Sequence, residues 1–324
     1  MEELKFTNRI DLTELQNEIH KIKEEISKVI VGQKNMINLL LTALLSEGHV
    51  LIEGVPGIAK TLTSKLLAKS LEIDYQRIQF TPDLMPSDVL GTSIFDLKTS
   101  TFEFKKGPIF SNLVLIDEIN RAPAKTQAAL FEVMEEQQIT MDGEQYLLES
   151  PYMVIATQNP IDQEGTYKLP EAQMDRFLFM INIDYPTAQE EVEILNREQN
   201  NTQPKLDQII NRLDQKKILT FQALVKQVLV EDHLLQYIAD IVVNTRNHPF
   251  LYLGASPRAS ISLLKASKAY AAIDGRDFVT PEDIKLMAIP VLQHRVIVTP
   301  EREMEGMTSA QIITESVEST EIPS

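Results

Sequence analysis

The fold of this chain is decided by an eight-residue stretch, Gly54-Val55-Pro56-Gly57-Ile58-Ala59-Lys60-Thr61. It follows the apolar run Val50–Ile52 and leads into a helix-like segment, residues 62–68. A strand, a glycine-rich turn, a Lys-Thr pair and a helix form the context in which a phosphate-binding loop is expected. Backbone N–H groups of such a loop form a concave anion site, and the following helix adds the positive end of its dipole. We therefore predict that Lys60 reaches the β- and γ-phosphates of a nucleotide and that the Thr61 hydroxyl ligates Mg²⁺.

One position in this loop departs from the usual pattern, which has glycine where this chain has Ala59. Alanine suits the first turn of the following helix, while Gly54 and Gly57 keep the backbone freedom that the bend requires. The loop is therefore expected to bind phosphate, provided that other parts of the chain supply the remaining chemistry.

The composition limits the class of protein. With 324 residues, 43% of them hydrophobic and 24% charged, the chain is long enough for a large core and for two domains. Its apolar runs are shorter than the roughly 18 residues that cross a bilayer, and its start is charged, so we expect a cytoplasmic protein without membrane insertion. The lack of cysteine excludes disulfides and thiolate metal sites. The histidines are scattered without the spacing of metal ligands, at His20, His49, His233, His248 and His294.

The charge of the chain bears on its partners. A formal net charge of −16 argues against a general nucleic-acid binder, because binding to phosphates needs clustered Lys and Arg. The net charge does not exclude a small basic patch, for example one on the inner surface of a ring-shaped assembly. Residues 301–324 carry six Glu and one Arg among Ser and Thr, and we expect this acidic tail to be solvated and partly disordered.

The first 186 residues are expected to form helices followed by an α/β core. Apolar residues at steps of three and four predict an amphipathic helix over residues 11–30, and a second helix follows over residues 35–45. Strand and helix patterns then alternate, which favours a mostly parallel sheet covered on both faces, with ligands at the carboxyl ends of its strands. The predicted strands are Val50–Ile52, Arg77–Phe80, Leu113–Ile116, Met153–Thr157 and Phe177–Ile183. Two hairpins, within residues 94–104 and 139–147, are interpreted as insertions.

Helical patterns dominate after Pro186, and Thr280-Pro281-Glu282-Asp283 is typical of a helix start. We therefore predict four parts, namely an N-terminal amphipathic helix (1–30), an αβα core (31–186), a small all-α lid domain (187–300) and the acidic tail (301–324).

A pair of carboxylates supplies the second chemical signal. Asp117 and Glu118 directly follow the apolar run Leu113–Ile116. A core strand ending in a solvated acid pair is common, but with a phosphate loop upstream the pair is what Mg·ATP hydrolysis needs. We expect Asp117 to hold Mg²⁺ through water and Glu118 to polarise the attacking water.

Three further polar residues are candidates for the same reaction. Asn159 ends the next predicted strand and is expected to orient the lytic water, although Asn-Pro alone merely starts a turn. Arg258 lies in a first helical turn, where a cation opposes the helix dipole unless a bound phosphate compensates. Arg176 either pairs with Asp175 or Glu171, or points outward as an arginine finger for a neighbouring subunit.

Together these motifs resemble the MoxR family of AAA+ ATPases. The resemblance rests on residues 54–61, Asp117 to Gln127, Ala156 to Pro160 and Asp175 to Phe177, in the right order and spacing. The Asp-Glu-Ile-Asn-Arg-Ala-Pro run and the Ala-Lys-Thr form of the loop are specific to that family. We trace the resemblance from about Val31 to Pro300, leaving the N-terminal helix and the acidic tail outside it.

The resemblance implies a fold, a cofactor and partners. It implies a P-loop αβα core with a helical lid, Mg·ATP bound between the two at a subunit junction, and a homo-hexameric ring. It further implies a chaperone-like activator of proteins with von Willebrand factor A domains, with tasks such as cofactor or metal insertion. The two hairpins match the helix-2 insert and the pre-sensor-1 insert, which face the pore or the substrate in related rings.

The resemblance also assigns residues. It implies that residues 31–33 lie along the adenine, that Asn159 is sensor 1, that Arg258 is sensor 2 and that Arg176 is the finger acting in trans. With Lys60 these are the predicted catalytic groups beside Glu118, and Gln79 is a candidate switch that restrains Glu118. The predicted nucleotide contacts are Val31, Gly32, Gln33, Gly54, Val55, Pro56, Gly57, Ile58, Ala59, Lys60, Thr61, Leu62 and Arg258.

Two other functions remain open at this point. One is a nucleic-acid motor or transcriptional activator, against which the net charge and the lack of a recognisable DNA-binding domain count. The other is a nucleotide-gated binding scaffold with slow turnover, against which the intact carboxylate pair counts.

Overall fold

The structure is a computed structural model that describes residues 10–55, 57, 60–98, 100–159, 167, 169–200 and 213–323. The chain divides into two compact units. The first, here called the core unit, comprises residues 22–218, and the second, here called the helical unit, comprises the residues up to Lys21 together with Leu219–Ser324.

The core unit contains the whole parallel sheet. Its strands in the sheet are β1 His49–Gly54, β2 Tyr75–Gln79, β5 Leu113–Asp117, β8 Met153–Gln158 and β9 Phe177–Ile183. Its helices are α2 Lys34–Leu45, α3 Lys60–Ser70, α4 Pro86–Leu90, α5 Ala124–Glu136, α6 Glu171–Met174 and α7 Ala188–Gln199, with the short 3-10 helix η1 Ile119–Arg121. Helix α1, Thr13–Val29, begins in the helical unit and ends in the core unit.

The five strands lie in the order β2-β5-β8-β1-β9, and every neighbouring pair is parallel. All five predicted strands are therefore confirmed. A parallel sheet of this kind must be covered on both faces, because its strands are apolar on both sides. In β5 every residue is buried.

The two faces of the sheet carry different helices. Val114 and Ile116 of β5 belong to a buried cluster that includes Leu130, Phe131 and Met134 of α5. The residues that alternate with them point to the opposite face. Helix α3 contacts β5, and α2 contacts β1 and β9, so these two helices complete the predicted αβα arrangement.

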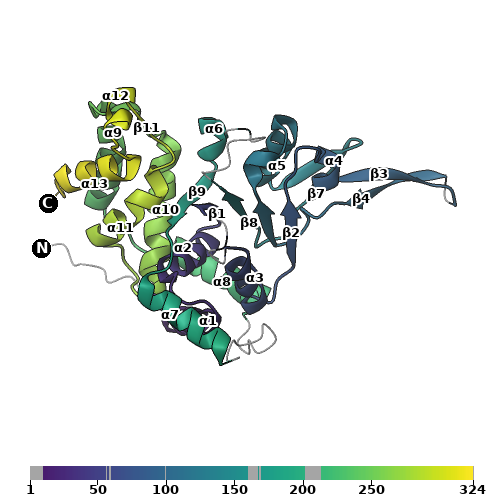
Figure 1. Cartoon of the computed structure of the whole chain (residues 1–324), viewed down its shortest axis with the longest axis horizontal. Coiled ribbons are helices and arrows are strands. Elements are labelled where there is room, and N and C mark those ends of the chain that lie inside the picture. Colours follow the sequence, from purple (N-terminus) through teal and green to yellow (C-terminus); the bar gives the residue numbers. More distant parts are fainter. Residues whose placement is uncertain are drawn as a thin grey trace, which may run out of the picture. The chain divides into compact units, whose positions relative to one another are not determined.

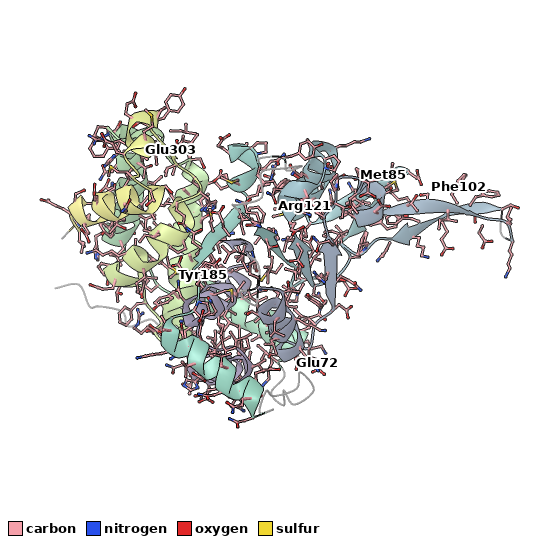
Figure 2. The ribbon with its side chains drawn as sticks, in the orientation of Figure 1. Glu72, Met85, Phe102, Arg121, Tyr185 and Glu303 are labelled. Atoms are coloured by element: carbon pink, nitrogen blue, oxygen red, sulfur yellow. The ribbon has the colours of Figure 1, made fainter. Side chains whose placement is uncertain are left out.

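Both predicted hairpins are present as separate two-stranded sheets. One pairs β3 Gly91–Asp96 with β4 Thr101–Lys106, and the other pairs β6 Gln138–Met141 with β7 Glu144–Leu147. Figure 1 shows β3 and β4 projecting from the rest of the core unit. Phe102, which is 72% exposed, lies on this projection in Figure 2. The second hairpin turns at Asp142-Gly143, where both φ angles are positive (53° and 86°), as the favoured two-residue turn requires.

The helical unit is built from packed helices and one short ribbon. Its helices are the end of α8 Gln215–Lys226, then α9 Asp232–Asn247, α10 Pro257–Ile273, α11 Pro281–Leu292, α12 Pro300–Met304 and α13 Ser309–Ser319. Strands β10 Leu251–Leu253 and β11 Ile297–Val298 pair antiparallel, a small addition to the predicted helices. Helix α10 ends just before Gly275, which has φ +77° and whose N–H donates to the Ala272 carbonyl oxygen at 3.0 Å, as is common after the end of a helix.

The prediction of a disordered tail is wrong. Residues 309–319 form α13, which contacts α9 and α11 and is capped at its start by Thr308 and Gln311. Ile312, Ile313 and Val317 recur at helical spacing and are buried. The acidic residues that suggested disorder lie outside this apolar stripe, so the stripe can pack against other helices of the helical unit.

The predicted domain boundaries also shift. Helix α7 was assigned to the lid, but residues up to 218 belong to the core unit. Arg197 of α7 donates a hydrogen bond from Nη1 to the Lys28 carbonyl oxygen at 2.8 Å, which ties α7 to the end of α1. The boundary was predicted at Pro186 because strand patterns end there. The end of strand patterns does not reveal which unit the following helix packs against.

His49 is a buried polar residue at the start of β1. Its Nδ1 accepts a hydrogen bond from the Val154 N–H at 3.0 Å, and its Nε2 lies 3.1 Å from the Met134 carbonyl oxygen. Because Nδ1 is an acceptor, Nε2 carries the proton and donates to Met134. Burial is the main cause that lowers the pKa of His49 to about 4.

This pKa makes a prediction about acid stability. Between pH 6.5 and about 4 the unfolded chain binds a proton at His49 that the folded chain does not. The stability of the core unit should therefore fall by roughly 3 kcal/mol as the pH falls through this window. Urea unfolding followed by circular dichroism at several pH values checks this. In His49→Gln, which cannot titrate, the part of the pH slope that His49 supplies should vanish, and an unchanged slope would contradict the assignment.

Candidate functional site

The predicted site lies at the carboxyl edge of the parallel sheet. Strands β5, β8 and β1 are adjacent there, with Ile116 opposite Ala156 and Glu53 opposite Gln158. The groups that follow these strands therefore meet at one edge, as the sequence predicted. Gln158 Nε2 donates to Glu53 Oε1 at 3.0 Å and joins two of the strand ends directly.

The phosphate loop connects β1 to α3. Of its predicted contacts, Pro56, Ile58 and Ala59 lie outside the described residues. Gly57 has φ +89°, a backbone conformation that favours glycine, and added side-chain volume there would meet no atom within 4 Å. Helix α3 begins at Lys60, so Thr61 and Leu62 lie in its first turn, where free N–H groups attract anions.

Lys60 turns back over the loop. Its Nζ donates to the Gly54 carbonyl oxygen at 2.6 Å. Burial lowers the pKa of Lys60, while the nearby charges of Asp117, Glu118 and Glu53 act in the opposite direction. The amine is therefore a partly desolvated cation within the field of several carboxylates, and an anionic ligand would offset the cost of its burial.

Asp117 is the buried centre of the site, at 6% exposure. Its Oδ1 accepts a hydrogen bond from Thr157 Oγ1 at 3.1 Å. Its Oδ2 lies 3.4 Å from Thr61 Oγ1 and accepts a hydrogen bond from Arg77 Nε at 2.6 Å. The two residues predicted to serve Mg²⁺, Thr61 and Asp117, are thus brought face to face.

Glu118 directly follows β5 in a left-handed conformation, with φ 58° and ψ 52°. Its N–H donates to Thr157 Oγ1 at 3.1 Å. Its Oε2 accepts from Gln79 Nε2 at 2.8 Å and lies 3.2 Å from Nε of Arg121, which Figure 2 labels. A residue other than glycine pays a conformational cost in this region of backbone angles, and such strained residues cluster at functional sites.

This donor set fits a magnesium nucleotide. Mg²⁺ in phosphate-transferring sites uses one or two carboxylates together with substrate phosphates rather than a cage of protein ligands. Thr61 Oγ1 and Asp117 Oδ2 supply two oxygens facing each other, and Lys60 supplies a cation for the phosphates. Within the described ranges no group of three or more His, Cys, Asp or Glu could hold a metal by itself.

The core unit also contains Asn159 and residues 31–33, which were predicted to serve the lytic water and the adenine. Asn159 directly follows β8, at the same edge as Asp117. Gly32 and Gln33 have φ angles of +72° and +56° and form the bend between α1 and α2 after Val31. A side chain at Gly32 would be strained by the positive φ and would require the Glu190 side chain of α7 to move, because its Cβ would lie 2.5 Å from Glu190 Oε1.

Arg176 lies at the amino-terminal ends of the parallel strands, opposite the carboxyl ends where the predicted site lies. It precedes β9, whose first residue, Phe177, pairs with His49 at the start of β1. A strand rises about 3.3 Å per residue, so the loop that follows β1 is roughly 16 Å further along the sheet. Arg176 pairs with Glu135 of α5, from Nε at 2.8 Å and from Nη2 at 2.7 Å.

Arg258 is the candidate from the helical unit. Ser256 and Pro257 form the predicted start of α10, with Pro257 at the first position, and Arg258 is exposed in that first turn. Its position in the first turn of the helix agrees with the sequence prediction.

Comparisons with known proteins show which family the chain resembles. The model of the ATPase family associated with various cellular activities (AAA) matches residues 49–179, and that of the AAA lid domain matches residues 243–316. The chain is 40% identical over 321 residues to Chaperone MoxR1 of Mycobacterium tuberculosis, covering 95% of this chain and 84% of that protein.

This chain belongs to the MoxR family of AAA+ ATPases.

Two further comparisons extend the MoxR likeness along the chain. The Bacillus subtilis protein YeaC is 46% identical over 313 residues, which cover 95% of this chain and 97% of that protein. A crystal structure from Cytophaga hutchinsonii is 43% identical, covers 97% of each chain and has a TM-score of 0.87. The limits traced from the sequence, Val31 to Pro300, were therefore too narrow, and the AAA lid match itself enters the acidic tail.

Sequence reasoning missed two residues that organise this MoxR site. Thr157 links Asp117 to the Glu118 backbone, and Arg77 holds Asp117 Oδ2. A signal for Arg77 was available, because it alternates with Gln79 and therefore shares one face of β2 with it. None of the helices in the described part of the chain is long and apolar enough to cross a membrane.

Proposed function

We propose that this chain hydrolyses ATP in a Mg²⁺-dependent reaction and uses the cycle to remodel or activate partner proteins. The observation that carries the proposal is the approach of Thr61 Oγ1 to Asp117 Oδ2, at 3.4 Å, with Glu118 as the next residue. A phosphate-loop hydroxyl and a strand-end carboxylate are the groups that hold Mg²⁺ in P-loop hydrolases.

Each residue has a distinct proposed role. Lys60 leaves the Gly54 carbonyl oxygen and donates to the β- and γ-phosphates. Thr61 ligates the metal and Asp117 holds it through water, and the metal would supply charge neutralisation on the phosphates when bound. Glu118 accepts a proton from the attacking water, and Asn159 orients that water.

Two arginines complete the proposed site. Arg258 acts as sensor 2 and offsets charge on the transferred phosphoryl group. Arg176 acts on the site of a neighbouring copy, which its position at the opposite edge of the sheet supports, since it lies roughly 16 Å along β1 from its own loop. A head-to-tail contact of this kind closes into a ring when the rotation allows it, and we propose a homo-hexamer.

The proposed clients are proteins, in particular those with von Willebrand factor A domains, and the task is maturation, including cofactor or metal insertion. The relative named Chaperone MoxR1 supports action on proteins. The exposed apolar side chains on β3 and β4, including Phe95 and Phe102, give the core unit a surface suited to polypeptide contacts.

A trapping experiment tests the choice of client. Glu118→Gln is expected to bind ATP, hold its ring and retain clients, whereas a second variant that also carries Lys60→Ala should bind no ATP and retain none. ATP-dependent recovery of a von Willebrand factor A protein on the first variant alone supports the proposal. Recovery of nucleic acid alone would favour a nucleic-acid motor instead.

A further inference from the structure

Arg77 donates to the proposed metal-binding carboxylate, Asp117, over a shorter distance than Thr157 or Thr61 does. It lies on β2, its side chain is 51% exposed, and its Nε donates to Asp117 Oδ2 at 2.6 Å. The same guanidinium donates from Nη2 to Gln79 Oε1 at 3.3 Å. Neither bond is needed for the sheet, because β2 and β5 are already paired through their backbones from Tyr75 to Gln79.

The oxygen that Arg77 holds is the one that faces Thr61. Asp117 Oδ1 is turned to Thr157, while Oδ2 lies 3.4 Å from Thr61 Oγ1. An Asp117 that serves a metal together with Thr61 would therefore use Oδ2. A guanidinium and a divalent cation repel each other, and the water by which the metal is held would need the same oxygen as its acceptor, so the two are competitors.

Gln79 links Arg77 to Glu118, the second carboxylate of the proposed site. It accepts from Arg77 at Oε1 and donates from Nε2 to Glu118 Oε2 at 2.8 Å. Arg121 Nε also lies 3.2 Å from Glu118 Oε2. A single chain of side chains, Arg77 and then Gln79, thus joins the carboxylate proposed to hold the metal to the carboxylate proposed to activate water.

We propose that Arg77 is a positioning residue that competes with the metal for Asp117 and, through Gln79, makes the release of Glu118 depend on metal binding. This rests on the proposed ATPase function. When Asp117 Oδ2 turns to the metal, Arg77 gives up its best acceptor and swings away. Gln79 then loses its fixed donor and releases Glu118 Oε2, whose longer contact to Arg121 Nε, at 3.2 Å, leaves the side chain able to turn toward the attacking water.

The first test measures metal binding separately from hydrolysis. Binding of a ribose-labelled fluorescent ATP is titrated with Mg²⁺ in the wild type, in Arg77→Met and in Arg77→Lys. Loss of one charged hydrogen bond at a half-exposed site should lower the Mg²⁺ concentration for half-maximal binding in Arg77→Met by roughly three- to tenfold. Arg77→Lys keeps a competing cation and should remain near the wild type. Gln76→Ala, on the other face of β2, is the matched control.

The outcomes separate this inference from the proposed function. If labelled ATP fails to bind the wild type at any Mg²⁺ concentration, the proposed function itself fails. If it binds but the Arg77→Met midpoint is unchanged or higher, Arg77 does not compete for the metal and the inference is wrong. Weaker binding of labelled ATP to Arg77→Met in EDTA would also overturn it, since Arg77 would then contact the nucleotide. Should Arg77→Met fail to melt cooperatively, Arg77→Gln replaces it.

A second test addresses the link to Glu118. Arg77→Met, Gln79→Leu and the double variant are compared in turnover number at saturating Mg·ATP. If Arg77 acts on Glu118 through Gln79, the double variant should change the rate no more than the larger of the two single variants does. Independent, multiplicative effects would contradict the link through Gln79.

Discussion

Replacing Glu118 with glutamine is expected to lower the rate of ATP hydrolysis by about 10²- to 10⁴-fold while ATP binding stays within a few-fold of the wild type. Glutamine keeps the size of the side chain and an acceptor oxygen for Gln79 and Arg121, which bond Glu118 Oε2. It cannot accept the proton of the attacking water. Phosphate release and binding of labelled ATP, measured on the same preparation, check both parts of this prediction.

A matched variant separates this effect from a general loss of charge. Glu132, an exposed residue of α5, can be changed to glutamine in the same unit. Glu132→Gln should leave the rate unchanged. Equal losses in both variants, or a full rate in Glu118→Gln, would remove Glu118 from the proposed chemistry.

Arg176→Ala is expected to lower turnover by about 10³- to 10⁵-fold in an assembled ring, because an arginine acting in trans offsets charge on the transferred phosphoryl group. The bond of Arg176 to Glu135 offers the control. If Arg176 only stabilises α5 against β9, then Glu135→Ala should do comparable damage. If Arg176 is a finger, Glu135→Ala frees it and should keep turnover within about fivefold, since a partly exposed ion pair contributes little stability.

Mixing two inactive variants makes the same prediction sharper. Arg176→Ala subunits keep Glu118, and Glu118→Gln subunits keep Arg176. In randomly mixed rings about a quarter of the sites would combine an intact Glu118 with a neighbour's Arg176, so roughly that share of the wild-type rate should return. A mixture as inactive as its two components, in rings shown to exchange subunits, would place Arg176 outside the neighbouring site.

The sequence predicted the sheet well because each strand is a short apolar run between polar residues. The edge at which Lys60, Thr61 and Asp117 meet followed from parallel topology alone, since carboxyl ends of parallel strands share one edge. The side chains that contact these residues could not be predicted in this way. Arg77 reaches Asp117 only because β2 lies beside β5, and strand order cannot be derived from local pattern.

The tail and Arg176 show the same limit. In residues 309–319 composition pointed to disorder, yet Ile312 and Ile313 are buried against other helices of the helical unit. For Arg176 the sequence suggested either an ion pair with a near neighbour or a finger role in trans, whereas the partner seen in the structure, Glu135, is 41 positions away. In both cases the deciding contacts are long-range, and local patterns do not contain them.

The central claim is that this chain hydrolyses ATP with Mg²⁺ at the site formed by Lys60, Thr61, Asp117 and Glu118. The most direct measurement is phosphate release from ATP by the purified chain, at concentrations where it assembles, with Mg²⁺ and with EDTA, beside Lys60→Ala. Release by the wild type that requires Mg²⁺ and is lost in Lys60→Ala is the result we predict. Release that persists in Lys60→Ala or in EDTA, or no release by an assembled wild type that binds ATP, would contradict it.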